Sequence, residues 1–210
     1  MAEIRAFAEA DRTELRALFG YAGDGSPTAS LWGHEESEAA IYLHPYLDLD
    51  AGAAFVAVAD GALVGYLVGC ADGSVFPSER ARINDAIRKY RLSFRRQPAA
   101  FFARSLLDLA WAALRRLPVA GELDDPRWPA HLHINVAPAA RGTGAAEGLV
   151  RRWLAVLGET GCHLQTLREN TRAVRFFERM GFVQHGPDPL VPGIRYHGAR
   201  VHQHTMVRTP

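Results

Sequence analysis

Apolar and polar residues alternate strictly over residues 131–136, which predicts a strand with one apolar and one polar face. The apolar face carries Leu132, Ile134 and Val136, and the polar face carries His131, His133 and Asn135. Pro138 lacks the backbone N–H that a ladder needs, so we expect the strand to end before it. Beyond it the apolar residues recur at helical spacing, at positions 146, 149, 150, 153, 154 and 157. The pattern therefore predicts a strand, a turn and a helix in immediate succession.

The same two patterns, alternation for strands and helical spacing for helices, divide the rest of the chain. Further strands are expected at 4–7, 53–59, 62–70, 162–167, 182–185 and 199–207, with Asp60-Gly61 as a hairpin turn. Further helices are expected at about 11–20, 35–44, 78–96, 98–117 and 170–181, and loops at 20–33 and 187–193. A chain of 210 residues with this order is expected to form a single α/β domain over 1–210, with a helical insertion at about 77–118.

The turn before the central helix carries the residues Arg141, Gly142, Thr143, Gly144, Ala145 and Ala146. A glycine turn that opens a helix presents unpaired backbone N–H groups and the positive end of the helix dipole, which together bind phosphate. A Walker loop would need a lysine here, and a dinucleotide fingerprint would need glycine at position 147, which is Glu147. The alternative is a helix cap whose small residues allow tight packing.

The spacing Arg-x-x-Gly-x-Ala after Val136-x-Pro138 resembles the pyrophosphate arm of the GNAT N-acetyltransferases. A second stretch, Asn170 to Phe182, resembles the family's motif Asn-x-x-Ala-x-x-Phe-Tyr-x-x-x-Gly-Phe, and follows the first by one helix and one strand. The resemblance implies the GNAT fold, a mixed central sheet of about seven strands flanked by helices. Within that family, residues 129–134 resemble the acetyltransferase-like domains related to that of O-GlcNAc hydrolases.

The resemblance also implies an enzyme that uses acetyl-CoA as co-substrate and acetylates a primary amine of a small-molecule or peptide acceptor. A backbone N–H around Asn135 or Val136 would stabilise the tetrahedral oxyanion. The residues expected at the cofactor are Asn135, Val136, Arg141, Gly142, Thr143, Gly144, Ala145, Ala146, Asn170 and Phe177.

The incoming ammonium must lose a proton before attack, and a neutral imidazole can take it. His133 and His131 share the polar face of the central strand and are the candidate catalytic bases. Phe177 stands where the family commonly keeps the tyrosine that protonates the leaving thiolate. Either water, Tyr196 or His163 takes that role, or the protein is a non-catalytic acyl-CoA sensor.

Two histidine pairs suggest a competing class of protein. His131-x-His133 and His202-x-His204 each place two imidazoles on one face of a strand, and two such pairs could hold zinc in a metal hydrolase. Such a site usually includes a carboxylate or cysteine, and none lies nearby in the sequence. We therefore expect no metal.

The insertion and the first loop carry the remaining candidates. The arginines of the insertion are residues 80, 82, 88, 91, 95, 96, 104, 115 and 116. They indicate either an acidic acceptor or specificity lid, or a solvated helical pair whose arginine stems cover apolar surface. In GNAT proteins the segment between the first two helices lines the acceptor side, so Trp32 and His34 either touch substrate or anchor their own loop.

Composition excludes several classes. With 24 Lys and Arg against 23 Asp and Glu, the net charge of +1 argues against a nucleic-acid partner. Two cysteines make no disulfide framework, and the N-terminus has no apolar signal region, so we expect a cytoplasmic protein. The most apolar helix is interrupted by Arg104 and Asp108 and is too short for a bilayer, so no membrane is expected. A homodimer is compatible with the sequence.

Overall fold

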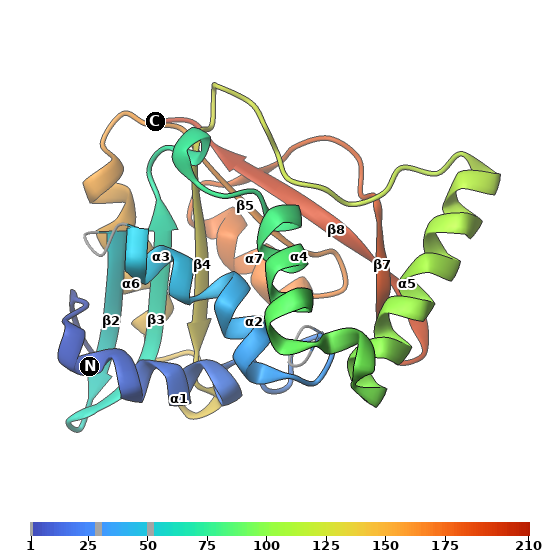
Figure 1. Cartoon of the computed structure of the whole chain (residues 1–210). Helices are drawn as coiled ribbons and strands as arrows, with labels where there is room; N and C mark the ends of the chain where they lie inside the picture. The colour runs from blue at the N-terminus through green and yellow to red at the C-terminus, as the bar shows by residue number, and fades with distance from the viewer. Residues whose placement is uncertain (1, 28–30, 50–52) are drawn as a thin grey trace.

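The protein is represented by a computed structural model that describes residues 2–27, 31–49 and 53–210 (Figure 1). Its strands are β1 (Glu3–Ala6), β2 (Ala54–Ala59), β3 (Ala62–Cys70), β4 (Ala130–Val136), β5 (Cys162–Leu167), β6 (Val183–Gln184), β7 (Leu190–Tyr196) and β8 (Ala199–Arg208). Its helices are α1 (Arg12–Ala22), α2 (Glu35–Tyr42), α3 (His44–Leu49), α4 (Glu79–Tyr90), α5 (Arg96–Arg115), α6 (Ala145–Leu157) and α7 (Thr171–Arg179). Within the described residues, no helix is long and apolar enough to cross a membrane.

One mixed sheet organises the molecule, in the order β1-β2-β3-β4-β5-β8-β6, with β7 paired to β8 beside this path. All neighbours are antiparallel except β4 and β5, which run parallel. The expected α/β class is confirmed. The described part of the chain has eight strands in this sheet, against the expected number of about seven.

Helices cover both faces of the sheet (Figure 1). On one face, α6 and α7 pack their apolar stripes, which include Trp153 and Phe177, against Leu67 and Leu132. On the other face, α1 to α3 pack against Tyr66 and neighbouring residues of β2 and β3. The strict alternation over 131–136 therefore divides β4 as predicted: its apolar residues face α6, and its polar residues face the α1–α3 layer.

The insertion forms α4 and α5 and has a core of its own. Trp32, Ile41, Ala86, Leu92 and Phe101 are buried together, so the insertion packs against α2 and the segment before it. The helix expected at 78–96 is shorter than predicted, because α4 ends at Tyr90. Arg91 then adopts the left-handed conformation, and a short 3-10 turn follows. Of the nine arginines of the insertion, eight are exposed and one, at position 82, is buried.

The segment 187–193, which the sequence predicts as a loop, is partly strand, because β7 begins at Leu190 and runs to Tyr196. Its register with β8 shifts between Val191 and Arg195, so the pairing is interrupted around Gly193. Proline and glycine at 192 and 193 conceal this strand in the sequence, and pairing with β8 supplies the order that the local pattern lacks.

Two helix boundaries near the N-terminus also differ from expectation. α1 continues through Gly20, because Ala22 extends the buried stripe of Leu15 and Leu18 by one turn. The helix expected at 35–44 ends at Tyr42, and α3 then begins with Pro45 as its second residue, where the missing N–H of proline costs nothing.

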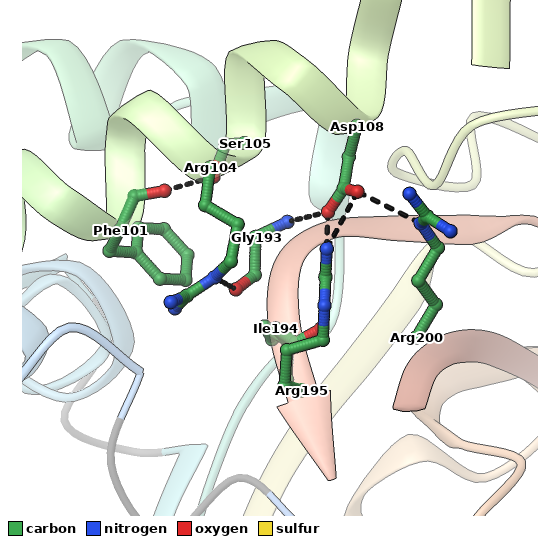
Figure 2. Close-up of polar contacts among 8 residues, drawn as sticks. All are labelled: Phe101, Arg104, Ser105, Asp108, Gly193, Ile194, Arg195 and Arg200. Atoms are coloured by element: carbon green, nitrogen blue, oxygen red, sulfur yellow. Dashed lines mark hydrogen bonds and ion pairs between the residues drawn. The ribbon is translucent and has the colours of Figure 1, made fainter. Parts of the chain in front are cut away.

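A buried carboxylate fastens the insertion to the β7–β8 hairpin (Figure 2). Asp108 of α5 is 1% exposed, and its oxygens accept hydrogen bonds from the backbone N–H of Gly193 at 2.9 Å and from both terminal nitrogens of Arg195 at 2.7 and 2.8 Å. Arg200 Nε adds a bond of 2.9 Å, and Arg104 Nε donates to the carbonyl of Gly193 at 2.6 Å. The two guanidinium groups beside it hold the pKa of Asp108 well below its usual range, so the carboxylate stays ionised.

We expect Asp108→Asn to lower the free energy of unfolding by about 3 kcal/mol, because it removes one charge of a buried ion-pair cluster and leaves Arg195 and Arg200 without compensation. Urea denaturation followed by circular dichroism measures the change. Asp85→Asn is the matched control, since it breaks an exposed pair with Arg88 in the same insertion and should have little effect. Equal losses in both variants would contradict the anchoring role.

Candidate active site

The site begins where β4 and β5 part. Their parallel pairing covers only Ala130 with Cys162 and His131 with His163. β4 continues to Val136, paired with β3, and β5 continues along β8. The facing edges of the two strands beyond the fork therefore have no ladder partner in each other, and the interval between these edges is called the opening below.

The register with β3 decides which backbone groups face this opening. Ala137 donates its N–H to Val64 O at 2.8 Å, so every second residue before it, including Asn135, also directs its N–H toward β3. The N–H groups of Val136 and Ile134 consequently point to the open edge. Of the two donors expected from the sequence, the alternation favours Val136. Ile134 was not among the sequence candidates, because the parity of the strand is known only once its pairing with β3 is known.

The glycine turn lies at the end of β4 and leads into α6. Gly142 and Gly144 adopt positive φ angles of 81° and 90°. A Cβ placed on either glycine would have no described atom within 4 Å, so the space beside both is open. Gly144 is the N-cap of α6 and has no side chain, and the first intrahelical bond runs from Gly148 N–H to its carbonyl at 2.9 Å. The N–H groups of Ala145 and Ala146 thus have no helical acceptor, and a phosphate can approach them closely.

The polar side chains of this turn are used within the protein. Arg141 donates from Nη2 to the carbonyls of Ala22 at 3.0 Å and Asp24 at 2.5 Å, which ties the turn to the end of α1. Thr143 Oγ1 donates to the carbonyl of Ala140 at 2.7 Å. These contacts fix the backbone of the turn, whose amides can then meet a cofactor.

The second predicted motif forms α7 as expected. Asn170 caps the helix, with its Oδ1 accepting the N–H of Ala173 at 3.3 Å, and Gly181 follows the helix at a φ of 85°. Phe177 is 5% exposed and contacts the rings of Phe176 and Phe182, with centroids at 5.0 and 5.6 Å. It belongs to the core on the α6 side of the sheet, and its ring carries no hydroxyl that could protonate a thiolate.

The two candidate bases lie on the opposite side, beneath aromatic rings that the sequence analysis did not single out. Tyr46 of α3 contacts both His131 and His133, with ring centroids at 5.5 and 5.3 Å, and Tyr42 of α2 contacts His133 at 5.7 Å. Phe76 adds an edge contact to His131 at 5.1 Å. Burial under these rings lowers the pKa of each of the two histidines to about 3, so both imidazoles are neutral at physiological pH.

The two groups considered as replacements for the missing tyrosine lie in different places. His163 stands on β5 at the fork, with its ring 5.7 Å from that of His131 and its Nδ1 2.7 Å from the carbonyl of Trp128. Tyr196 ends β7 and stacks near His197 at 4.1 Å, in the turn that leads to β8. His163 is therefore the replacement that lies at the opening between β4 and β5.

The histidine pairs considered for zinc do not meet. His202 Nδ1 lies 3.1 Å from Glu169, and His204 Nδ1 lies 2.7 Å from Asp188, while the other pair lies half-buried on β4. Over the ranges that the structure describes, no three His, Cys, Asp or Glu side chains are grouped as metal ligands would be. Each histidine of β8 is instead engaged with a carboxylate of its own.

Comparison with known proteins finds solved structures with the same fold. The solved structure of SsHAT is 20% identical and superposes with a TM-score of 0.60, covering 99% of this chain and 98% of that one. A structure of the histone acetyltransferase HPA2 and related acetyltransferase from Corynebacterium glutamicum is 17% identical, with a TM-score of 0.57 and coverage of 100% and 96%. The putative acetyltransferase yncA from Salmonella typhimurium, solved with its cofactor acetyl-CoA, is 14% identical, with a TM-score of 0.59 and coverage of 100% and 94%.

At these identities the likeness shows a shared fold. The sequence model of the acetyltransferase (GNAT) family matches residues 19–182, a range that includes the glycine turn, the parting strands and the whole of α7. That match covers most of the chain and agrees with the resemblance seen in the two motifs. This chain therefore belongs to the acetyltransferase (GNAT) family and is an N-acetyltransferase family enzyme.

Proposed function

We propose that this protein transfers the acetyl group of acetyl-CoA to a primary amine of a small-molecule or peptide acceptor. Enzymes of the family use acetyl-CoA. One observation carries the proposal: the glycine turn with its free amides adjoins the open edge of β4, so a phosphate site and a row of backbone donors lie in succession. In acetyl-CoA a diphosphate is followed by an arm with amide groups and then by the thioester, which matches the order of the sites.

In this proposal the N–H groups of Ala145 and Ala146, with the positive end of α6, hold the pyrophosphate. The edge of β4 pairs with the amide-bearing arm, and the N–H of Ile134 or Val136 donates to the thioester oxygen as it becomes an oxyanion. Asn170 keeps its amide nitrogen as a further donor, because its Oδ1 is used in the helix cap.

His133, with His131 beside it, is proposed to accept a hydrogen bond from the incoming amine. An imidazole whose pKa is about 3 is a weak base, so the ammonium loses its proton to water and His133 orients the neutral amine. The proton that the nitrogen releases after attack on the thioester also passes to water. Arg82, buried at 8% exposure with its guanidinium 4.9 Å from the Phe76 ring, adds positive potential to the same cluster. Burial and this charge both disfavour a second cation there, which favours the deprotonated form of a bound amine.

Phe177 supports a second candidate, an acyl-CoA-binding protein that turns its ligand over slowly or not at all. The ring is buried and carries no proton for the leaving thiolate. Steady-state assays against a panel of amines separate the two candidates, because only an enzyme produces free CoA in proportion to the amine added.

Gly144→Val tests the phosphate site. A β-branched residue is strained at a φ of 90° and places its side chain in the open space beside the turn, so acetyl-CoA affinity should fall at least about tenfold by calorimetry. Gly186→Val is the matched control, since Gly186 has a φ of 72° and open space far from the turn in sequence. Unchanged affinity in a folded Gly144→Val protein would remove the proposed cofactor site.

His133→Ala should lower turnover roughly tenfold or more while leaving acetyl-CoA affinity nearly intact, since the histidine meets the amine. Because the pKa of His133 is about 3, the acidic limb of the rate profile should follow the pKa of the amine used and should persist in the variant. His202→Ala, on β8, is the control. A limb near pH 6.5 that disappears in His133→Ala would contradict the neutral role.

Phe177→Tyr restores a hydroxyl at the position where the family keeps one. Acetyl transfer should accelerate wherever departure of the thiolate limits the rate, and the free protein should lose about 1–3 kcal/mol of stability, because the new hydroxyl is buried without a partner. Phe176→Tyr, one residue earlier in the same helix, is the control. If Phe177→Tyr accelerates acetyl transfer with neither poor nor good amine nucleophiles, the group that protonates the thiolate lies elsewhere.

A further inference from the structure

An open cavity of about 510 Å³ lies where the start of α5 meets the segment before α2. Gly33 and His34 form one wall, and Arg95, Arg96 and Gln97 form the other. No carboxylate lines the cavity among the residues for which the structure gives a position. The mechanism proposed above uses none of these side chains.

His34, Arg95 and Arg96 supply hydrogen-bond donors to the cavity. His34 Nδ1 accepts the N–H of Ser37 at 3.2 Å, so a neutral imidazole carries its proton on Nε2. Among the described residues, Arg95 bonds through Nε alone, at 3.0 Å to the carbonyl of Tyr90, so its terminal nitrogens can meet a ligand. Arg96 is exposed beside it, at the positive end of the 20-residue helix α5.

The walls of the cavity are held close together. Gly33 has a φ of 73°, which favours glycine, and it lies against the Gln97 amide, since a Cβ at this position would stand 2.5 Å from Gln97 Oε1. The nearby carboxylate of Glu38 is buried beneath the wall and accepts the N–H groups of Trp32, Gly33 and His34 at 3.0, 3.1 and 3.4 Å. Its charge is thus compensated inside the protein.

Charge is distributed unevenly along the chain. Residues 78–117 contain ten Arg and Lys against three Asp and Glu, a net charge of +7, whereas the whole protein has a net charge of +1. The two arginines of the cavity are therefore part of a strongly positive element that attracts anions over several ångströms. Guanidinium groups bind carboxylate and phosphate in a bidentate geometry, which gives the attraction a defined partner.

The cavity and the proposed acetyl-transfer site lie at opposite ends of one helix. His34 is the N-cap of α2, and Tyr42, its last residue, contacts the ring of His133. Eight steps of 1.5 Å each separate His34 from Tyr42 by about 12 Å along the axis of α2. An extended acceptor can therefore place one end in the cavity and its amine at His133.

We propose that this cavity binds an anionic group of the acceptor, a carboxylate or a phosphate, at the end of α2 opposite to the nitrogen that is acetylated. The protein then selects amines that carry a negative charge. This inference rests on the proposed function for the role of the amine, and on the cavity alone for the binding of the anion.

Matched peptides test the selectivity. Each has one lysine and carries Glu, phosphoserine or Gln at a position two to four residues from it. We expect kcat/KM for the Glu or the phosphoserine peptide to exceed that for the Gln peptide at least tenfold at low salt, and to fall as salt is added. Preference for Glu alone assigns a carboxylate, preference for phosphoserine alone a phosphate, and preference for both the shared anion chemistry. Equal rates with all three peptides would overturn the proposal.

Substitution in the cavity gives the second comparison. The double variant Arg95→Gln/Arg96→Gln should abolish the preference and leave the rate with the Gln peptide unchanged. Arg80→Gln/Arg88→Gln removes the same charge from exposed positions of α4 outside the cavity and should retain the preference. A preference that survives in the cavity variant, or that is lost equally in both variants, contradicts a site at Arg95 and Arg96.

A binding measurement separates this proposal from the proposed function. The same acidic peptides with acetyl-lysine in place of lysine cannot react, and calorimetry with the full chain needs no acetyl-CoA. The cavity variant should weaken their binding at least tenfold, and the α4 variant should not. If the peptides bind through the cavity but Gly144→Val leaves acetyl-CoA affinity unchanged, acetyl transfer is refuted and the anion site stands. If the peptides do not bind, or bind the cavity variant as tightly as the unchanged protein, the anion site is refuted and acetyl transfer stands.

Discussion

Two adjacent parallel strands that stop pairing leave backbone groups without partners, and the rest of this protein compensates for that interruption. β4 and β5 can part because each is fully paired along its other edge, β4 with β3 and β5 with β8. The helices that follow the strands, α6 and α7, then cover one face of the fork with a common core. Both strands of the fork are therefore held from outside, and the N–H groups on the inner edge of β4, which pair with no described strand beyond His131, can serve a ligand.

The two faces of β4 divide the chemistry. The apolar residues of the strand join the core beneath α6, while the histidines on its other face lie among aromatic rings from α2, α3 and the segment before α4. Because those rings exclude water, the same packing that stabilises the first layer of helices also sets the protonation state of His131 and His133. Structural packing and acid–base behaviour are thus consequences of one arrangement.

Local signals in the sequence were sufficient for the central elements. The change from a period of two to a helical period, with Pro138 and the glycines between, predicted β4, the turn and α6, and the capping residue Asn170 predicted α7. β7 was missed because Pro192 and Gly193 contradict a strand locally, and its order comes from β8 and Asp108. The donor at the open edge and the burial of His133 also depend on long-range pairing and on Tyr42 and Tyr46, which no local pattern contains.

The carboxylate of Asp108 makes the insertion and the β7–β8 hairpin mutually dependent. Excising α4 and α5 to recover a shorter domain would leave Arg195 and Arg200 next to each other with no counter-charge, and the N–H of Gly193 with no acceptor. Grafting the helices onto another member of the fold would bury an unpaired carboxylate. Asp108 and its partners lie 85 to 92 residues apart in the sequence, so a chimera that replaces the insertion must replace the β7–β8 hairpin with it.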